Sequence, residues 1–189
     1  MIGALLVLTA LLYAAQSLVL TPTTGGAVDG TVRAGLERQA ADVLATSAAD
    51  GSLSRTVRYW NNSTVEGTFA GARRPAVGYG NATPPTALGE ALSERFVRRG
   101  YRIDVEVTYL VAAEPARWET MRLVYQGVPS EDAVVATHPV TLYDDDVLAG
   151  PRTANETLAA AHESGVYPIP DVAPNGSLYN TVEVRLVVW

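Results

Sequence analysis

The pattern of apolar and polar positions separates the start of the chain from the rest. Residues 2–20 form a run of 19 residues without a charged side chain. As a helix this run would extend roughly 28 Å, close to the ~30 Å hydrocarbon thickness of a bilayer. Only a helix satisfies its own backbone hydrogen bonds in lipid, so the sequence predicts a transmembrane helix over residues 1–20.

A helical pattern resumes after a proline and two glycines. Residues 21–26 contain Pro22 and Gly25-Gly26, which predict either a kink or a short linker. Apolar residues then recur at helical spacing, with most charged residues on other faces. These apolar positions are Val28, Val32, Leu36, Val43 and Leu44. We therefore expect an amphipathic helix over residues 27–49, ended by Asp50-Gly51, within a stalk segment 21–50.

From residue 51 onward the period changes to that of strands. In residues 101–109 apolar and polar positions alternate strictly, which is typical of an antiparallel strand with one apolar and one wet face. Further strands are predicted at 56–60, 65–69, 118–125, 133–143 and 181–189. A second amphipathic helix is predicted at 86–99, before Gly100, and a helical turn at 156–162 in a loop-rich region. Residues 51–189 are thus expected to form one β-rich head in an α+β fold.

Composition excludes several kinds of site. The net charge of −6 argues against nucleic acid and anionic lipid surfaces as partners. All 14 basic residues are Arg, a composition that suits a salt-adapted protein or, alternatively, a GC-rich genome. The chain has no Cys, which excludes disulfides, thiolate metal sites and Cys nucleophiles. The head must therefore be stabilised by burial.

Asparagine is used in an unusual way. The sequence has six Asn, and five of them begin an Asn-X-Ser/Thr sequon without proline at the middle position. These glycosylation candidates are Asn61, Asn62, Asn81, Asn155 and Asn175. Sequons are useful only where a glycosylation machinery acts, outside the cytosol. The alternative is that such clusters are simply turns. The glycosylation hypothesis places the head outside the cell and the N-terminus inside.

Few residues suggest catalysis or metal binding. His138 and His162 lack a neighbour pattern typical of metal ligands, and there is no nucleophile-elbow motif. The run 144–146, three successive Asp, either binds a cation such as Ca²⁺ or forms a solvated turn, and its spacing matches no EF-hand loop. A cluster of arginines complements a helix C-terminus or docks an acidic partner. It consists of Arg95, Arg98, Arg99 and Arg102. We expect no cofactor, and the sequence identifies no small-molecule ligand.

Several stretches resemble an uncharacterised haloarchaeal family of pilin-like membrane proteins, related to type IV pilins and pseudopilins. They are GALLVLTALLYAAQ, ADVLATSAADGSLSRTVRYWN, LVYQGVPSEDAV, TLYDDD and LYNTVEVRLVVW. The resemblance covers nearly the full length and implies a pilin-like fold, in which an N-terminal transmembrane helix continues into an amphipathic helix packed on an antiparallel sheet. Two features depart from pilins. Met1 stands directly at the hydrophobic stretch without a basic leader, and position 5 is Leu5 where many bacterial pilins have Glu.

The resemblance implies a function that depends on packing. We expect a membrane-anchored, single-pass subunit of a cell-surface filament or secretion-type assembly, with membrane lipid and other pilin-like subunits as its partners. The residues expected to pack in the membrane and in the assembly are Leu5, Leu6, Leu8, Leu12 and Tyr13. The alternative is a stand-alone surface binding module on a single anchor. A continuous helix through Pro22 favours the first, and a flexible linker the second. An enzyme is not expected.

Overall fold

The computed structural model describes residues 27–61, 68–72, 77–112, 115–151, 153 and 155–189. The chain divides into two compact units, Met1–Thr31 and Val32–Trp189. Of the first unit, only the opening residues of one helix are described. The architecture below is that of the second unit.

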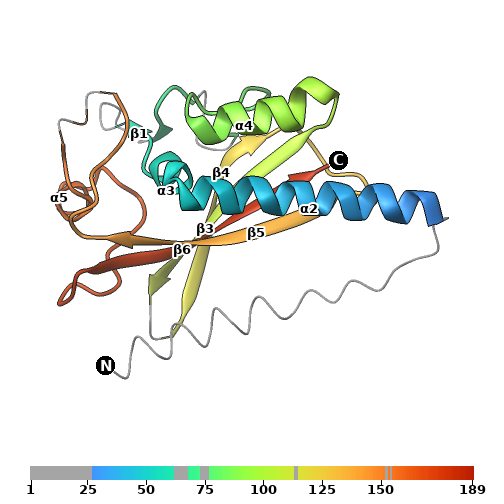
Figure 1. The fold of residues 1–189 in the computed structure, drawn as a ribbon. Helices are drawn as coiled ribbons and strands as arrows, with labels where there is room; N and C mark the ends of the chain where they lie inside the picture. Colours follow the sequence, from blue (N-terminus) through green and yellow to red (C-terminus); the bar gives the residue numbers. More distant parts are fainter. Residues whose placement is uncertain (1–26, 62–67, 73–76, 113–114, 152, 154) are drawn as a thin grey trace. The chain divides into compact units, whose positions relative to one another are not determined.

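Helices cover one side of an antiparallel sheet in this unit (Figure 1). The helices are α2 (Ala27–Ala49), which begins in the first unit, α3 (Ser52–Val57), α4 (Ala87–Arg95), the 3-10 turn η1 (Val97–Arg99) and α5 (Leu158–Glu163). The main sheet contains β3 (Ile103–Ala112), β4 (Arg117–Tyr125), β5 (Val134–Tyr143) and β6 (Leu178–Val188), in the order β4-β3-β6-β5. A separate pair joins β1 (Trp60–Asn61) to β2 (Thr68–Phe69).

The C-terminal strand β6 lies in the middle of the sheet. Its neighbours are β3 and β5, and both pairings are antiparallel. Alternate residues of β6 are fully buried, as their period of 2 predicted. They are Val182, Val184, Leu186 and Val188. Beyond the strand, Trp189 exchanges two backbone hydrogen bonds with Arg102. The strand predicted at 181–189 is therefore confirmed, and it is packed between two neighbours.

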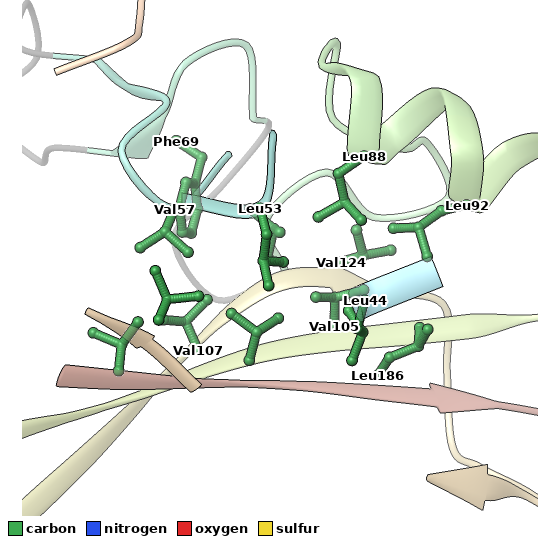
Figure 2. Packing of buried hydrophobic residues seen from close by; sticks show 14 of the residues in the cluster. Leu44, Leu53, Val57, Phe69, Leu88, Leu92, Val105, Val107, Val124 and Leu186 are labelled. Carbon is green, nitrogen blue, oxygen red and sulfur yellow. The ribbon is translucent and has the colours of Figure 1, made fainter. Parts of the chain in front are cut away.

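One hydrophobic core joins the helices to the sheet. From α2 it takes Ala40, Val43 and Leu44, while α4 contributes Leu88 and Leu92. Figure 2 shows Leu44 of α2 beside the strand residues Val105 and Leu186, with the α4 leucines above Val124. Burying one such side chain stabilises a fold by roughly 1.5–3 kcal/mol. A cluster of this kind can therefore stabilise the head without disulfides.

The connection after α2 differs from the predicted strand at 56–60. Gly51 has φ 77°, a left-handed conformation that suits glycine and ends α2. The Asp50 carboxylate then accepts a hydrogen bond from Ser52 N at 2.8 Å, and α3 begins. Within α3, Leu53 and Val57 lie one turn apart and are both buried. Helical spacing of these two apolar residues outweighed the strand propensity of Thr56-Val57. Of the strands predicted at 56–60 and 65–69, the described residues show an antiparallel pair in which Trp60 lies opposite Phe69 and Asn61 opposite Thr68, while 62–67 lie outside the described residues.

The predicted fold class needs a correction. The structure is α+β with a β-sheet core, and α2 occupies the range 27–49 that its spacing predicted. However, no helix among the described residues is both long and apolar enough to cross a membrane. The long helix α2 carries Arg33, Glu37, Arg38 and Asp42, which make it too polar. The fold class with a transmembrane helix is therefore wrong for the described chain, and residues 1–20, where that helix was placed, lie outside the described residues.

Candidate functional site

The residues predicted to pack in an assembly belong to the start of the chain. Leu5, Leu6, Leu8, Leu12 and Tyr13 all lie outside the described residues, as does the 21–26 segment. Candidate sites among the described residues lie on the surface of the head, in its turns, in one groove, on the outer face of the sheet and along the edge strands.

The sequons occupy separate positions. Asn81, Asn155 and Asn175 are exposed and lie in different loops. Asn155 has φ 61°, which Asn tolerates better than most residues. Asn61 is half-buried in β1, opposite Thr68, and Asn62 lies outside the described residues. The structure thus leaves three described sequon side chains open to solvent and brings no two of them into one site.

The aspartate run 144–146 connects the turn after β5 to the end of α3. Asp146 forms an ion pair with Arg58 at 3.4 Å and accepts a hydrogen bond from Tyr143 N at 2.9 Å. Arg58 also donates to the Val147 carbonyl, so it ties the end of α3 to the turn after β5. Desolvation by burial, with help from Asp171 and Asp145, raises the pKa of Asp144. In the part of the chain that the structure describes, no three His, Asp or Glu side chains are grouped to hold a metal ion.

The two histidines lie apart from each other. His138 is half-buried in β5, and its Nδ1 lies 2.8 Å from the carbonyl oxygen of Pro139. His162 is exposed on α5 and contacts Tyr179 edge-on, with ring centroids 6.2 Å apart. The described contacts of these rings involve a backbone carbonyl and a tyrosine, which do not make a nucleophile–base pair.

The arginine cluster is exposed at the end of α4 and η1. Arg98 forms a long, exposed ion pair with Glu94 at 3.9 Å. Arg102 donates to the Gln126 carbonyl at 3.3 Å. Arg95 and Arg99 are exposed as well. Exposed pairs of this type contribute at most about 1 kcal/mol to stability. Because its arginines are exposed, the cluster forms a basic patch on the surface of an acidic protein.

Buried side chains hold the loop after α5 in place through hydrogen bonds, a feature that the sequence pattern did not predict. Asn180, the one Asn outside a sequon, is fully buried and donates from Nδ2 to the carbonyls of Leu110 (2.9 Å) and Pro170 (2.8 Å). Trp60 donates from Nε1 to the Val166 carbonyl at 2.9 Å. Tyr167 is buried against Trp60, and this burial raises the pKa of its hydroxyl well above the usual value. The sequence signal was a single aromatic residue, Tyr167, beside Pro168.

An open groove lies next to the ion pair between Arg58 and Asp146. It has a volume of about 1020 Å³ and is lined by parts of residues 50–58, 85–87 and 147–155. Its charged lining consists of Asp50, Arg55 and Arg58, and Arg58 is already paired with Asp146. Its polar, open character suits solvent better than a small apolar ligand, because ligand pockets are concave and mostly apolar.

The central part of the outer face of the sheet, turned away from α2 and α4, is polar. Thr108 and Thr120 share a hydrogen bond between their hydroxyls at 2.9 Å, and Glu106 pairs with Arg185 at 3.0 Å across β3 and β6. On the edge strand β4, Arg122 stacks over Tyr125 at 4.2 Å, and Trp118 is 39% exposed. This face matches the wet side predicted from the alternation in 101–109.

Comparison with known proteins adds a family. The model of a family of unknown function, DUF7288, matches residues 1–188. Searches of curated proteins and of solved structures find no match. Since the family model covers almost the whole chain, this protein belongs to DUF7288, a family of unknown function.

Proposed function

We propose that this protein is a pilin-like subunit of a cell-surface filament or secretion-type assembly, attached through residues 2–20 and presenting the 32–189 unit outside the cell. Membrane lipid and the equivalent segments of other subunits would be its partners. The proposal rests on the uncharged 2–20 segment, which stands only six residues before α2.

The burial pattern along α2 is the observation that carries the proposal. The later part of α2 is buried against the sheet through Ala40, Val43 and Leu44. The earlier part is exposed, and Val32 has 60% of its surface accessible. Within the compact unit, therefore, α2 packs on the core mainly through its C-terminal half, while the described residues 30–34 are exposed and Arg33 donates to the Ala133 carbonyl at 3.5 Å. A subunit that assembles through the start of its chain needs this arrangement.

The sequons support presentation outside the cell. Asn81, Asn155 and Asn175 are all exposed, as a glycan acceptor must be. A glycan at these positions would extend into solvent without disturbing the core. We therefore propose that the head is a glycoprotein surface, with no enzymatic activity of its own.

Fractionation of the native host tests attachment and assembly together. Cells carrying an epitope-tagged copy would be separated into membrane, soluble and sheared-surface fractions. We expect the protein in the membrane fraction and in the sheared surface material. Leu12→Arg should shift it to the soluble fraction, because a charge in the apolar segment costs about 2.5–3.5 kcal/mol on insertion scales. The same change at Val128, which is 82% exposed in the head, should leave fractionation unaltered.

Two results would separate the alternatives. Membrane attachment without any protein in the sheared material would favour the stand-alone surface binding module. Wild-type protein in the soluble fraction would contradict both. Intact-mass measurement of the native protein adds an independent test, since a bare polypeptide mass would contradict the glycosylated head.

A further inference from the structure

The two edges of the sheet differ in how they are closed. β4 and β5 are the outer strands of the order β4-β3-β6-β5. An exposed edge strand offers unpaired backbone N–H and C=O groups, and proteins usually blunt it with proline, charge or a covering segment. The edge that is left open is therefore the one that can receive another strand.

The β5 edge is blunted at its centre. Pro139 stands in the middle of β5 and has no backbone N–H to donate. Its carbonyl oxygen lies 2.8 Å from Nδ1 of the neighbouring His138. The residue in the middle of this edge thus lacks a donor, and its acceptor is already in contact with a side chain.

The β4 edge is closed only in part among the described residues. At its C-terminal end, Gly78 bridges Val124, and Tyr79 N donates to the Leu123 carbonyl at 2.9 Å. No described segment pairs with the outer edge of β4 ahead of this bridge. Residues 117–120 are exposed on this stretch, including the indole of Trp118. An aromatic side chain exposed on an open edge is typical of a contact surface.

The sequence of this stretch is self-complementary in one register. If two copies of β4 pair antiparallel about a two-fold axis at Thr120, Trp118 of each copy lies opposite Arg122 of the other, on the outer face. Arginine over tryptophan is a favourable cation–π pair. Glu119 then lies opposite Met121, so no like charges meet. An axis at Glu119 would instead oppose two carboxylates, and an axis between Glu119 and Thr120 would oppose Arg117 to Arg122.

We propose that the head pairs with a second copy of this chain through residues 118–122 of β4, in an antiparallel two-fold contact centred on Thr120 that joins the two sheets into one. Gly78 and Tyr79 limit this pairing to five residues, because they already occupy the edge at Leu123 and Val124. A contact this short is much smaller than the ~1,600 Å² of a standard stable interface. The dimer should therefore form where heads are concentrated and dissociate on dilution. This proposal does not depend on the assembly proposed above.

The absence of cysteine allows a direct test on the full chain. In Thr120→Cys the two new thiols face each other across the axis, where opposed Cα atoms are about 4.5–5.5 Å apart, within the range a disulfide spans. We expect a covalent dimer on mild oxidation, seen on a non-reducing gel. Thr137→Cys is the matched control, an exposed Thr on β5 that shares the outer face but lies on the blunted edge. It should cross-link at least about tenfold more slowly.

Two charge variants in the Thr120→Cys background test the register. Arg122→Glu removes the cation that faces Trp118 and should slow cross-linking strongly. Arg117→Glu makes the same charge change just outside the paired residues and should leave the rate nearly unchanged. Equal cross-linking of the Thr120 and Thr137 variants would overturn the proposal, since it would report random collision. Equal effects of the two glutamates would overturn the Thr120 register.

Discussion

The two faces of the main sheet are formed by the same four strands and differ in what they bury. On the face under α2 and α4, β3 and β6 present a continuous set of fully buried apolar residues such as Val105, Val107 and Val184. On the other face the same strands present Thr108, Glu106 and Arg185, which pair with each other or with neighbours. The apolar face therefore provides the stability, and the polar face contributes side-chain pairs that keep contact with water.

The largest expected effect comes from moving a charge onto the apolar face. Val184 is fully buried between Val107 and His138 of the neighbouring strands. Val184→Asp places an uncompensated carboxylate there, at a cost of several kcal/mol. That is comparable to the whole ~5–15 kcal/mol stability of a domain. We expect no cooperative thermal transition.

The adjacent residue provides the control for this change. Arg185→Gln removes one partner of a half-exposed ion pair on the polar face and should cost only about 1 kcal/mol. If both variants melted at the same temperature, the assignment of the two faces of β6 would be wrong.

The next largest effect is expected in the helix that covers the apolar face. Leu44 is 1% exposed, and Leu44→Ala should lower the free energy of unfolding by about 2–5 kcal/mol through the cavity it leaves. Val32→Ala, in the exposed part of the same helix, should change it by no more than about 0.5 kcal/mol. Urea titrations followed by circular dichroism measure both values. A large cost at Val32 would mean that the start of α2 is also packed in the native protein.

The ion pair on the polar face should contribute little. A double-mutant cycle with Glu106→Gln and Arg185→Gln isolates its coupling energy. We expect about 0.2–1 kcal/mol, because both side chains retain access to water. The value should fall further in 1 M salt, where the Debye length is about 3 Å. A coupling several times larger that persists in salt would indicate that something covers this face.

The smallest effect concerns a carboxylate at the margin of the polar face. Burial raises the pKa of Asp104, although Gln126 N donates a hydrogen bond to it at 2.6 Å. An acid whose pKa is higher in the folded state than in the unfolded state destabilises the fold when it ionises. Asp104→Asn should therefore raise the melting temperature near neutral pH by a few degrees at most. The gain should shrink as pH falls through the folded pKa and vanish below the unfolded value. Melting curves from pH 3 to 8 would show this, and a gain that was independent of pH would exclude the electrostatic cause.

Local periodicity determined much of this molecule. Helical spacing located α2 within residues 27–49, strict alternation identified β3 with its apolar face, and a strand was predicted over most of β6. The single helix predicted at 86–99 is in fact α4, which ends at Arg95, followed by the turn η1, and only the stop at Gly100, which has φ 90°, is as predicted. These features depend on interactions within a few residues, or on which face of one element is apolar, so the order of residues along the chain is enough to reveal them.

Only the tertiary structure decided which elements meet. Strand order left β4 as a partly open edge and β5 as a blunted one. Pro139 marks β5 as an edge strand, but nothing within either strand specifies which strand pairs with it. The strand expected at Thr56-Val57 is part of a helix because Leu53 and Val57 bury the same face. Asn180 differs from the exposed sequon asparagines only because Leu110 and Pro170, 70 and 10 residues away, offer carbonyls to its amide. Such pairings depend on contacts between distant segments, which form only when the whole chain closes around its core.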